Sequence, residues 1–500
     1  MAQKGCHGGA DVMKQAAAAS GKSDVLKKLA EDYPQGPHDQ PQSMCPAFGS
    51  LRVGLRMRRT ATILSGSACC VYGLTFTSHF YGARRTVGYV PFDSETLVTG
   101  QLYEDIRNAV HEMADPGKYD AIVVTNLCVP TASGVPLDRL PKSIDGVRII
   151  GIDVPGFGVP THAEAKDVLA GAMLQYAREE AEQGPVPRPR NLVDDLPMVA
   201  LIGEFFPADP VGVAGMLKPM GLTIAPQTPC REWRDLYAAL DCVVGAAVHP
   251  FYTSVVRELR HAGRPIVGSG PVGVEGTSAW LDSIGKAANV ASDKIDAAKA
   301  AVLPAIQGSL QKSPINATVT VSGYEGSELL VARLLIEAGA TVPYVGTACP
   351  KTDWSADDRD WLETQGCHVQ YRASLEQDLA AMRDVNPDLA LGTTPLVQAA
   401  KEEGRPAVYF TNIVSARPLF GPAGAGALSA IVSSQARGKE RFQNMVQFFS
   451  KPEAEPSVAG ETVAAKVPEP AKSATKKTRR VFESKVLSDA GTNSTVPVGS

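Results

Sequence analysis

The sequence predicts an α/β protein that contains three doubly wound, Rossmann-like domains. Short apolar runs typical of buried parallel strands alternate with helical stretches, which is the pattern of successive βαβ units. The length of 500 residues also exceeds the roughly 250–300 residues that one hydrophobic core supports. Several domains in series are therefore expected.

The first α/β domain is predicted to span residues 45–190. Strands are expected at 120–125 and 147–154, because both segments are apolar runs of strand length. A long helix is expected from 162 to 182, and the proline-rich segment 184–189 predicts a linker after it.

Two further domains are predicted, at residues 191–312 and 313–450. The apolar runs predict strands at 197–206, 241–247 and 265–267 in the second domain, and at 317–321, 341–345, 389–393 and 407–411 in the third. A closing helix is expected at about 437–449.

Both ends of the chain differ in composition from these domains. Residues 1–44 are rich in Ala, Lys and Gly and are expected to form an N-terminal arm with one helix at about 11–29. Residues 451–500 are rich in Pro, Ala, Lys and Thr, with little to bury, so we expect a flexible tail.

The composition excludes several classes of protein. A formal net charge of −4 gives no general attraction to nucleic acid. No apolar run reaches the roughly 18 residues of a membrane span, and Asp11 and Lys14 interrupt the one candidate signal-peptide core. A cytoplasmic protein is expected, with peripheral contact to a membrane as an alternative. The cysteines include no CxxC pair, which argues against a zinc ribbon or a thioredoxin-type site.

Three cysteines are the main candidates for a functional site. Cys45, Cys70 and Cys128 each lie in a short segment flanked by Gly or Pro and next to an apolar run, so we expect them in rigid turns. Three thiolates from separate loops are one fewer than the four that an iron–sulfur cube requires. This deficit suggests a cluster shared with another chain, and the alternative is three unrelated core cysteines.

Four segments resemble the nitrogenase component 1 family. CPAFG at 45–49, SGSACCVYG at 65–73 and LCVP at 127–130 are similar to the family's three cluster-ligand segments, and VPGFG at 154–158 is similar to its Pro-Gly-Phe loop. The likeness covers roughly residues 45–450 and includes the three-domain layout. The middle segment is one residue shorter than the family's loop. Cys69 therefore remains an alternative to Cys70, which matches the loop at more positions.

The resemblance implies that Cys45, Cys70 and Cys128 each bind one iron of a [4Fe–4S] cluster. The fourth ligand would come from a homologous subunit, Z, in a heterotetramer with two copies of each chain. Electrons would come from a separate iron protein, subunit X, which hydrolyses ATP, so no ATP is expected to bind here.

The resemblance also implies a reaction. The favoured expectation is an ATP-dependent, two-electron reduction of the C7=C8 double bond in ring B of chlorophyllide a, a step of bacteriochlorophyll synthesis. Protochlorophyllide as the substrate, or a role as a nitrogenase-like cofactor scaffold, are the alternatives within the family. A non-catalytic α/β binding module with incidental cysteines is the alternative from a different class.

Three segments bear on nucleotide binding. Residues 268–273 fit G-x-G-x-x-G after a strand, but Pro271 and the lack of a following strand that ends in an acidic residue argue against a dinucleotide site. Residues 16–23 end like a P-loop without its first glycine. Gly323 and Gly326 are typical either of a turn whose backbone N–H groups bind an anion or of a simple tight turn. We expect no nucleotide site.

The remaining candidates are basic side chains and histidines. One basic cluster follows the first cysteine and two arginines follow the second: Arg52, Arg56, Arg58 and Arg59, then Arg84 and Arg85. They would dock an acidic electron donor, bind a propionate, or form a solvated face. His79 and His162 are candidate proton donors by location, with a structural role as the alternative.

Overall fold

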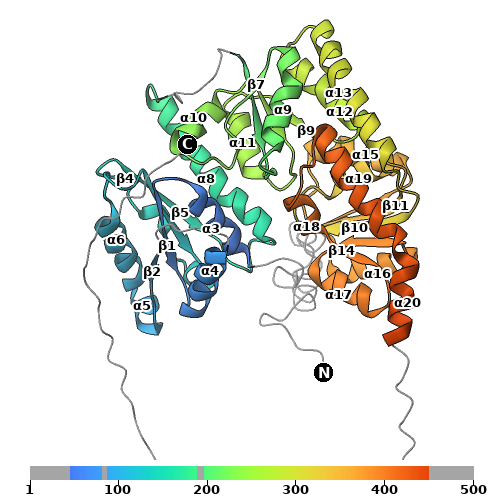
Figure 1. Ribbon diagram of the computed structural model, residues 1–500. Coiled ribbons are helices and arrows are strands. Elements are labelled where there is room, and N and C mark those ends of the chain that lie inside the picture. Colours follow the sequence, from blue (N-terminus) through green and yellow to red (C-terminus); the bar gives the residue numbers. More distant parts are fainter. Residues whose placement is uncertain (1–44, 81–86, 188–195, 450–500) are drawn as a thin grey trace, which may run out of the picture. The chain divides into compact units, whose positions relative to one another are not determined.

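Three sheets, each mostly parallel and flanked by helices, form the described part of the protein (Figure 1). The structure is a computed structural model that describes residues 45–80, 87–187 and 196–449. The predicted arm with its helix at 11–29, and the predicted tail, lie outside the described residues. The fold class expected from the sequence is confirmed.

The first sheet has the strand order β2-β1-β3-β5-β4, and all its pairs are parallel except β4 with β5. Its strands are β1 (Thr60–Ser65), β2 (Val87–Val90), β3 (Ala121–Asn126), β4 (Ser143–Ile144) and β5 (Val147–Asp153). Its helices are α3 (Pro46–Arg56), α4 (Ala68–Phe80), α5 (Ser94–Thr99), α6 (Gln101–Met113), α7 (Cys128–Ala132) and α8 (His162–Gln183), with a 3-10 turn at Leu137–Arg139.

The second sheet is parallel and has the strand order β7-β6-β8-β9. Its strands are β6 (Met198–Ile202), β7 (Thr223–Ile224), β8 (Val244–Ala247) and β9 (Ile266–Gly268). Its helices are α9 (Asp209–Leu217), α10 (Trp233–Leu240), α11 (Thr253–His261), α12 (Val274–Ala287) and α13 (Ser292–Lys312), with a 3-10 turn at Lys218–Met220.

The third sheet is also parallel, in the order β12-β11-β10-β13-β14. Its strands are β10 (Thr318–Gly323), β11 (Thr341–Thr347), β12 (His368–Tyr371), β13 (Leu389–Gly392) and β14 (Ala407–Tyr409). Its helices are α14 (Glu328–Glu337), α15 (Ala356–Thr364), α16 (Leu375–Val385), α17 (Thr394–Glu402), α18 (Phe410–Ser415), α19 (Gly421–Arg437) and α20 (Lys439–Phe449), with a 3-10 turn at Asp353–Ser355.

The structure corrects some of the expected elements. The strand expected at 197–206 ends at Ile202, because Gly203 adopts a positive φ of 156° and turns the chain. The helix expected at 437–449 begins at Lys439, and a separate helix, α19, precedes it up to Arg437. The sequence did not predict strands β1, β2, β4, β7 and β12.

The hydrophobic cores extend across the sheets. One buried cluster joins apolar side chains of the second and third sheets, such as Val199 and Val321, and another joins the first and second, such as Val123 and Ala200. All described residues belong to one compact unit that ends at Phe449. The boundaries at 190, 312 and 450 stay predictions. Within the described ranges, no helix is both long enough and apolar enough to cross a membrane.

Candidate functional site

The candidate site lies where the first sheet changes its winding direction. Strand β1 pairs with β2 on one side and with β3 on the other. The loops that leave the ends of β1 and β3 therefore run toward opposite sides of the sheet. Ser65 at the end of β1 lies opposite Asn126 at the end of β3. In open α/β sheets, ligands bind beyond the carboxyl ends of the strands at such a point. Cys70 and Cys128 follow these two strand ends.

A glycine brings these two loops into contact. A Cβ atom on Gly66 would lie 2.4 Å from Cδ1 and 2.8 Å from Cβ of Leu127, so no side chain fits there. The Leu127 N–H donates a hydrogen bond of 2.8 Å to the Ser65 carbonyl. The close approach of the two chain segments therefore depends on the missing side chain at position 66.

The cysteines lie at the beginnings of helices rather than in the turns that the sequence suggested. Cys45 is the N-cap of α3, whose first residue is Pro46, while Cys69 and Cys70 lie in the first turn of α4 and Cys128 opens α7. For Cys70 and Cys128, the reason is that the chain enters a helix almost directly after β1 and β3. Proline at the first helical position favours this start because its φ is already helical.

The thiols of these segments lie close enough to interact electrostatically. Partial burial, together with the neighbouring Cys69, Cys45 and Cys128, raises the pKa of Cys70 to about 11. Burial also raises the pKa of Cys45, with a contribution from Cys128. The structure therefore brings together all three cysteines predicted from the sequence, and Cys70 interacts with both of the others.

The Pro-Gly-Phe loop contacts one of these sulfurs. The Gly156 N–H donates a hydrogen bond of 3.1 Å to Sγ of Cys128. Such hydrogen bonds to ligand sulfurs tune the potential of iron–sulfur clusters. Within the described ranges, no group of three or more His, Cys, Asp or Glu side chains converges on a single metal ion.

Large apolar side chains around the thiols are exposed to solvent. Tyr72 and Phe76 on α4 are 71% and 54% exposed, and their rings stack with centroids 6.1 Å apart. Val129, next to Cys128, and Phe157, next to Gly156, are also exposed. We call Tyr72, Phe76, Val129 and Phe157 the apolar rim. Exposed apolar surface of this kind is typical of a protein interface.

A second polar cluster joins the first and second sheets. Lys166 on α8 is buried, and its ammonium lies 2.9 Å from the carboxylate of Glu204, which follows β6. The Glu204 N–H donates a hydrogen bond of 3.2 Å to Nδ1 of His249, which follows β8. The proton of the neutral His249 ring therefore lies on Nε2.

The charges of this cluster determine its protonation states. Burial raises the pKa of Glu204, but the positive charges of Lys166, Arg52 and Arg56 outweigh this effect and hold the pKa well below its usual range. Burial lowers the pKa of His249 to about 4. The arrangement therefore holds a carboxylate and a neutral imidazole at physiological pH.

The sequence interpretation missed this cluster, although a signal was present. Glu204 and His249 each come directly after a buried strand run, MVALIG and VVGAAV respectively. The carboxyl ends of the neighbouring strands β6 and β8 meet at one edge of the sheet. Lys166 carried no comparable signal, since it lies within a long helix, away from any strand end.

His162 lies beside this cluster. Its ring packs edge-on against Tyr324 of the third sheet, with centroids 5.2 Å apart, and lies 6.5 Å from the ring of Phe48 on α3. Burial holds the pKa of His162 well below its usual value, and the charge of Lys166 lowers it further. His162 is thus buried between aromatic rings, whereas the side chain of His79 lies outside the described residues.

The basic cluster after the first cysteine forms ion pairs within the chain. Arg56 lies 3.7 Å from Glu204, Arg58 lies 2.6 Å from Glu232, and Arg59 lies 2.8 Å from Asp120. These pairs support the solvated-face interpretation over a free docking patch. Arg84 and Arg85 lie outside the described residues.

Comparison with known proteins gives a consistent result. The family of nitrogenase component 1 type oxidoreductases matches residues 45–434. The chain is 65% identical over 446 residues to the chlorophyllide reductase 52.5 kDa chain of Cereibacter sphaeroides, with 89% of each protein covered. It is 64% identical over 448 residues to the protein of the same name from Rhodobacter capsulatus, with 90% of each covered.

More distant similarities point in the same direction. Subunit N of the light-independent protochlorophyllide reductase of Synechococcus sp. is 22% identical over 306 residues, which are 60% of this chain and 70% of that protein. Among solved structures, a nitrogenase, Cp1 at pH 6.5, superposes with a TM-score of 0.60 at 16% identity and covers 84% of this chain and 96% of its own. This structural likeness supports the fold alone.

Proposed function

The chain belongs to the family of nitrogenase component 1 type oxidoreductases, and from this premise we propose that it is the Y subunit of chlorophyllide a reductase. In this proposal it carries part of the catalytic component that reduces the C7=C8 double bond of ring B in bacteriochlorophyll synthesis. Its 64–65% identity to two chlorophyllide reductase chains, over about nine-tenths of its length, supports this most directly.

Cys45, Cys70 and Cys128 would hold three irons of a [4Fe–4S] cluster. When bound, such a cluster supplies electrons one at a time at low potential. The chain's own contribution is to fix the three thiolates on separate helix starts. Gly66 allows two of those starts to approach, and the Gly156 N–H supplies a hydrogen bond to the Cys128 sulfur.

A partner subunit would complete the cluster. Proteins of this family work as heterotetramers with a partner subunit and receive electrons from an iron protein. We assign the fourth cluster ligand to the homologous Z subunit, because the three thiols found together here are one short of four. The apolar rim around them supports a protein partner, since exposed tyrosine and phenylalanine side chains are typical of interfaces. In this proposal the iron protein X hydrolyses ATP.

The alternatives receive less support. The likeness to a protochlorophyllide reductase subunit is 22% identity over 60% of the chain, far below the likeness to the chlorophyllide reductase chains. A non-catalytic binding module is not favoured, because the family is one of oxidoreductases. The substrate proposal therefore rests on the relatives, and the ligand proposal rests on the geometry of the thiols.

The cluster proposal is tested by iron analysis and anaerobic EPR of the chain co-expressed with the Z subunit. We expect a reduced [4Fe–4S] signal in the wild type, its survival in Cys69→Ser, and its loss or alteration in Cys70→Ser. Cys69 is a matched control because it occupies the same helical turn and is also exposed. The reverse pattern would move the ligand to Cys69, and an iron-free wild-type complex would contradict the cluster.

The substrate proposal is tested separately by feeding the complete system with chlorophyllide a or protochlorophyllide and following their absorption spectra. We expect ATP-dependent conversion of chlorophyllide a only. Conversion of protochlorophyllide instead would contradict the substrate while leaving the cluster intact.

A further inference from the structure

The turn from β9 to α12 has the sequence of a dinucleotide-binding loop. Residues 268–273 read GSGPVG and lead directly into a helix of 14 residues. In dinucleotide-binding domains, glycines at these positions allow a pyrophosphate to approach the backbone N–H groups at the helix N-terminus. Whether this loop can bind a phosphate therefore depends on which group contacts the N–H groups at the start of α12.

The glycines of this loop pack against the chain itself. A Cβ atom on Gly268 would lie 1.7 Å from the Trp354 carbonyl oxygen, and one on Gly270 would lie 2.8 Å from the ring of Phe420. A Cβ on Gly273 would lie 2.3 Å from the carboxylate of Glu337. Trp354, Phe420 and Glu337 all belong to the part of the chain that forms the third sheet and its helices.

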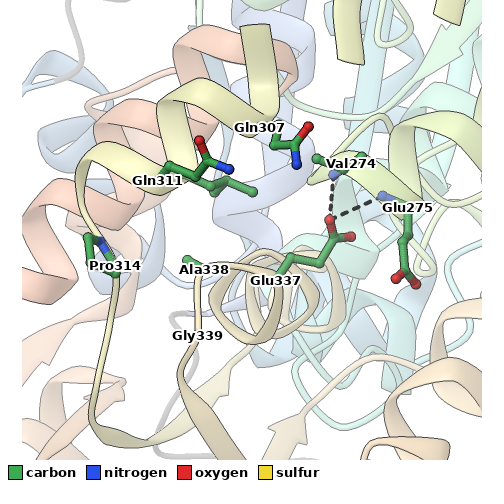
Figure 2. Close-up of a pocket in the computed structure, with 9 residues that line it drawn as sticks. Val274, Glu275, Gln307, Gln311, Pro314, Glu337, Ala338 and Gly339 are labelled. Atoms are coloured by element: carbon green, nitrogen blue, oxygen red, sulfur yellow. Dashed lines mark hydrogen bonds between the residues drawn. The ribbon is translucent and has the colours of Figure 1, made fainter. Parts of the chain in front are cut away.

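The carboxylate of Glu337, at the end of α14, occupies the position of an anion. It accepts hydrogen bonds from the backbone N–H groups of Val274, Glu275 and Gly276, the first three residues of α12; the distances from Glu275 and Gly276 are 3.1 and 3.2 Å. Figure 2 shows Glu337 directed at the N–H groups of Val274 and Glu275. Three N–H groups on one carboxylate give the contact that a bound phosphate would make.

The surrounding charges fix this carboxylate and the other end of the loop. Arg333, one turn earlier on α14, lies 3.8 Å from Glu337 and 3.0 Å from Asp358 on α15. Asp358 in turn accepts a hydrogen bond of 2.8 Å from Ser269 Oγ. Two carboxylates from the third-sheet segment therefore bind the loop at both ends.

We propose that the N-terminus of α12 is an oxyanion site of the nucleotide-phosphate type that the chain's own Glu337 occupies as an internal ligand. The glycine-rich loop then ties α12 to α14 and α15 and leaves no position for an external phosphate. The wild-type chain does not use this loop to bind a nucleotide.

The third sheet repeats the arrangement on a smaller scale. Strand β10 ends at Gly323 and the turn after it contains Gly326, where the buried carboxyl group of Glu328 accepts hydrogen bonds from the N–H groups of Glu325 and Gly326. Thr347 Oγ1 donates a further hydrogen bond of 2.9 Å to it. Both glycine-bearing turns that the sequence suggested for anions are thus filled by a glutamate side chain of this protein.

A cavity beside Glu337 provides an approach for a small anion. It has a volume of about 420 Å³ and is lined by Val274, Glu275 and Glu337 together with Gln307 and Gln311 of α13 (Figure 2). Removal of the Glu337 side chain would therefore leave the N–H groups of α12 accessible to an added anion.

The test compares the full-length chain with Glu337→Gly and with the matched control Glu363→Gly. Glu363 is an exposed glutamate in the last turn of α15. Without added anion, we expect the Tm of Glu337→Gly to be about 2–4 °C below that of the control, from the loss of a carboxylate at a helix N-terminus. Inorganic phosphate should raise the Tm selectively in Glu337→Gly and give saturable binding by calorimetry only in that variant.

Equal Tm values of the two variants, or equal effects of phosphate on both, would overturn the proposal. A lower Tm of Glu337→Gly without selective rescue would also overturn it, because the side chain would then matter through packing alone. If Glu337→Gly does not fold, Glu337→Gln keeps the shape and removes the charge. A Tm of Glu337→Gln equal to the wild type would contradict an anionic ligand.

Discussion

Three strand-to-helix turns of this protein share a topology but differ in what completes them. The turns after β1 and β3 present thiols beside exposed aromatic side chains, whereas the turn after β9 is closed by Glu337 of the same chain. We refer to them as the open turns and the closed turn. Each follows the carboxyl end of a parallel strand, where such sheets bind ligands.

The difference shows that the strand order creates a potential ligand site at each turn. Tertiary contacts then determine whether an external ligand can occupy that site. In the closed turn, backbone N–H groups are already satisfied by a carboxylate, so an external anion would have to displace it. In the open turns, Cys69 and Cys70 are exposed, Cys128 is half-buried, and the side chains of the apolar rim are exposed. The following predictions test this contrast, from the largest expected effect to the smallest.

The largest effect is expected for Gly66→Ala in the open turns. The added methyl group would lie 2.4 Å from Leu127, so the turns after β1 and β3 must separate and the thiols of Cys70 and Cys128 would move apart. We expect loss of iron, a fall in reductase activity of about 10–100-fold, and a free energy of unfolding lower by about 1–3 kcal/mol. Iron analysis, activity and denaturant unfolding measure these effects.

Gly73→Ala is the control for this variant. Gly73 lies in α4, and a Cβ atom there would meet nothing within 4 Å. Alanine should leave the iron content unchanged and favour the helix by about 1 kcal/mol. Retention of iron in Gly66→Ala would contradict the role of the close approach.

The next effect concerns the pH dependence of a glutamate that fills a turn of the third sheet. Burial raises the pKa of Glu328 from 4.5 to about 7 in the folded protein. Its protonated form therefore contributes stability that is fully present below about pH 4.5 and is lost as the pH rises through about 7. Relative to Glu328→Gln, the wild-type free energy of unfolding should fall by up to about 3 kcal/mol across this window.

Denaturant unfolding of both proteins at several pH values measures this difference. A wild-type free energy of unfolding that runs parallel to that of Glu328→Gln between pH 4.5 and 7 would show that burial does not perturb this carboxyl group.

A smaller effect is expected from the apolar rim. Tyr72→Ser and Phe76→Ser should each weaken association with the partner subunit by about 30-fold, the effect of losing about 2 kcal/mol at an interface hot spot. Because both side chains are exposed in the isolated chain, its own Tm should not change. Analytical ultracentrifugation of the mixed subunits measures the association.

Val211→Ser on α9 serves as the control, since Val211 is 75% exposed and lies on the second-sheet segment. Unchanged association of the two rim variants with the partner subunit would show that the apolar rim is not part of the interface.

The smallest effect is expected for Arg58→Gln. Its ion pair with Glu232 is largely exposed, and such pairs contribute about 0–1 kcal/mol. We expect a change of this size in the free energy of unfolding and an electron-transfer rate from the iron protein within about twofold of the wild type. A large, salt-dependent loss of that rate would restore the docking interpretation of the basic cluster.

The sequence predicted most inner strands of the sheets but missed β1, an inner strand whose Thr and Ser residues interrupt the apolar run. The apolar run of β3 is buried along its whole length and therefore stands out. Edge strands such as β2 and β12 are short and partly exposed, so their composition gives little signal. The cysteines were expected in turns because their Gly and Pro neighbours suggest turns, whereas proline also fits the first position of a helix.

The candidate site was predictable only in part. The three cysteines were evident from their local sequence and the resemblance it carries. The contacts around them, such as the Gly156 N–H to the Cys128 sulfur, and the Lys166–Glu204–His249 cluster became evident only in the structure. Their members are separated by many residues, and no local pattern links them.

The sequence by itself determined the fold class and the positions of Cys45, Cys70 and Cys128, because strand burial and turn chemistry are local properties of the chain. Only the tertiary structure decided which turns are open. The motif at 268–273 matches the glycine spacing of a nucleotide loop, yet Glu337, 64 residues beyond Gly273, fills it. The physical reason is that a helix N-terminus binds whichever anion the packing of the chain brings to it.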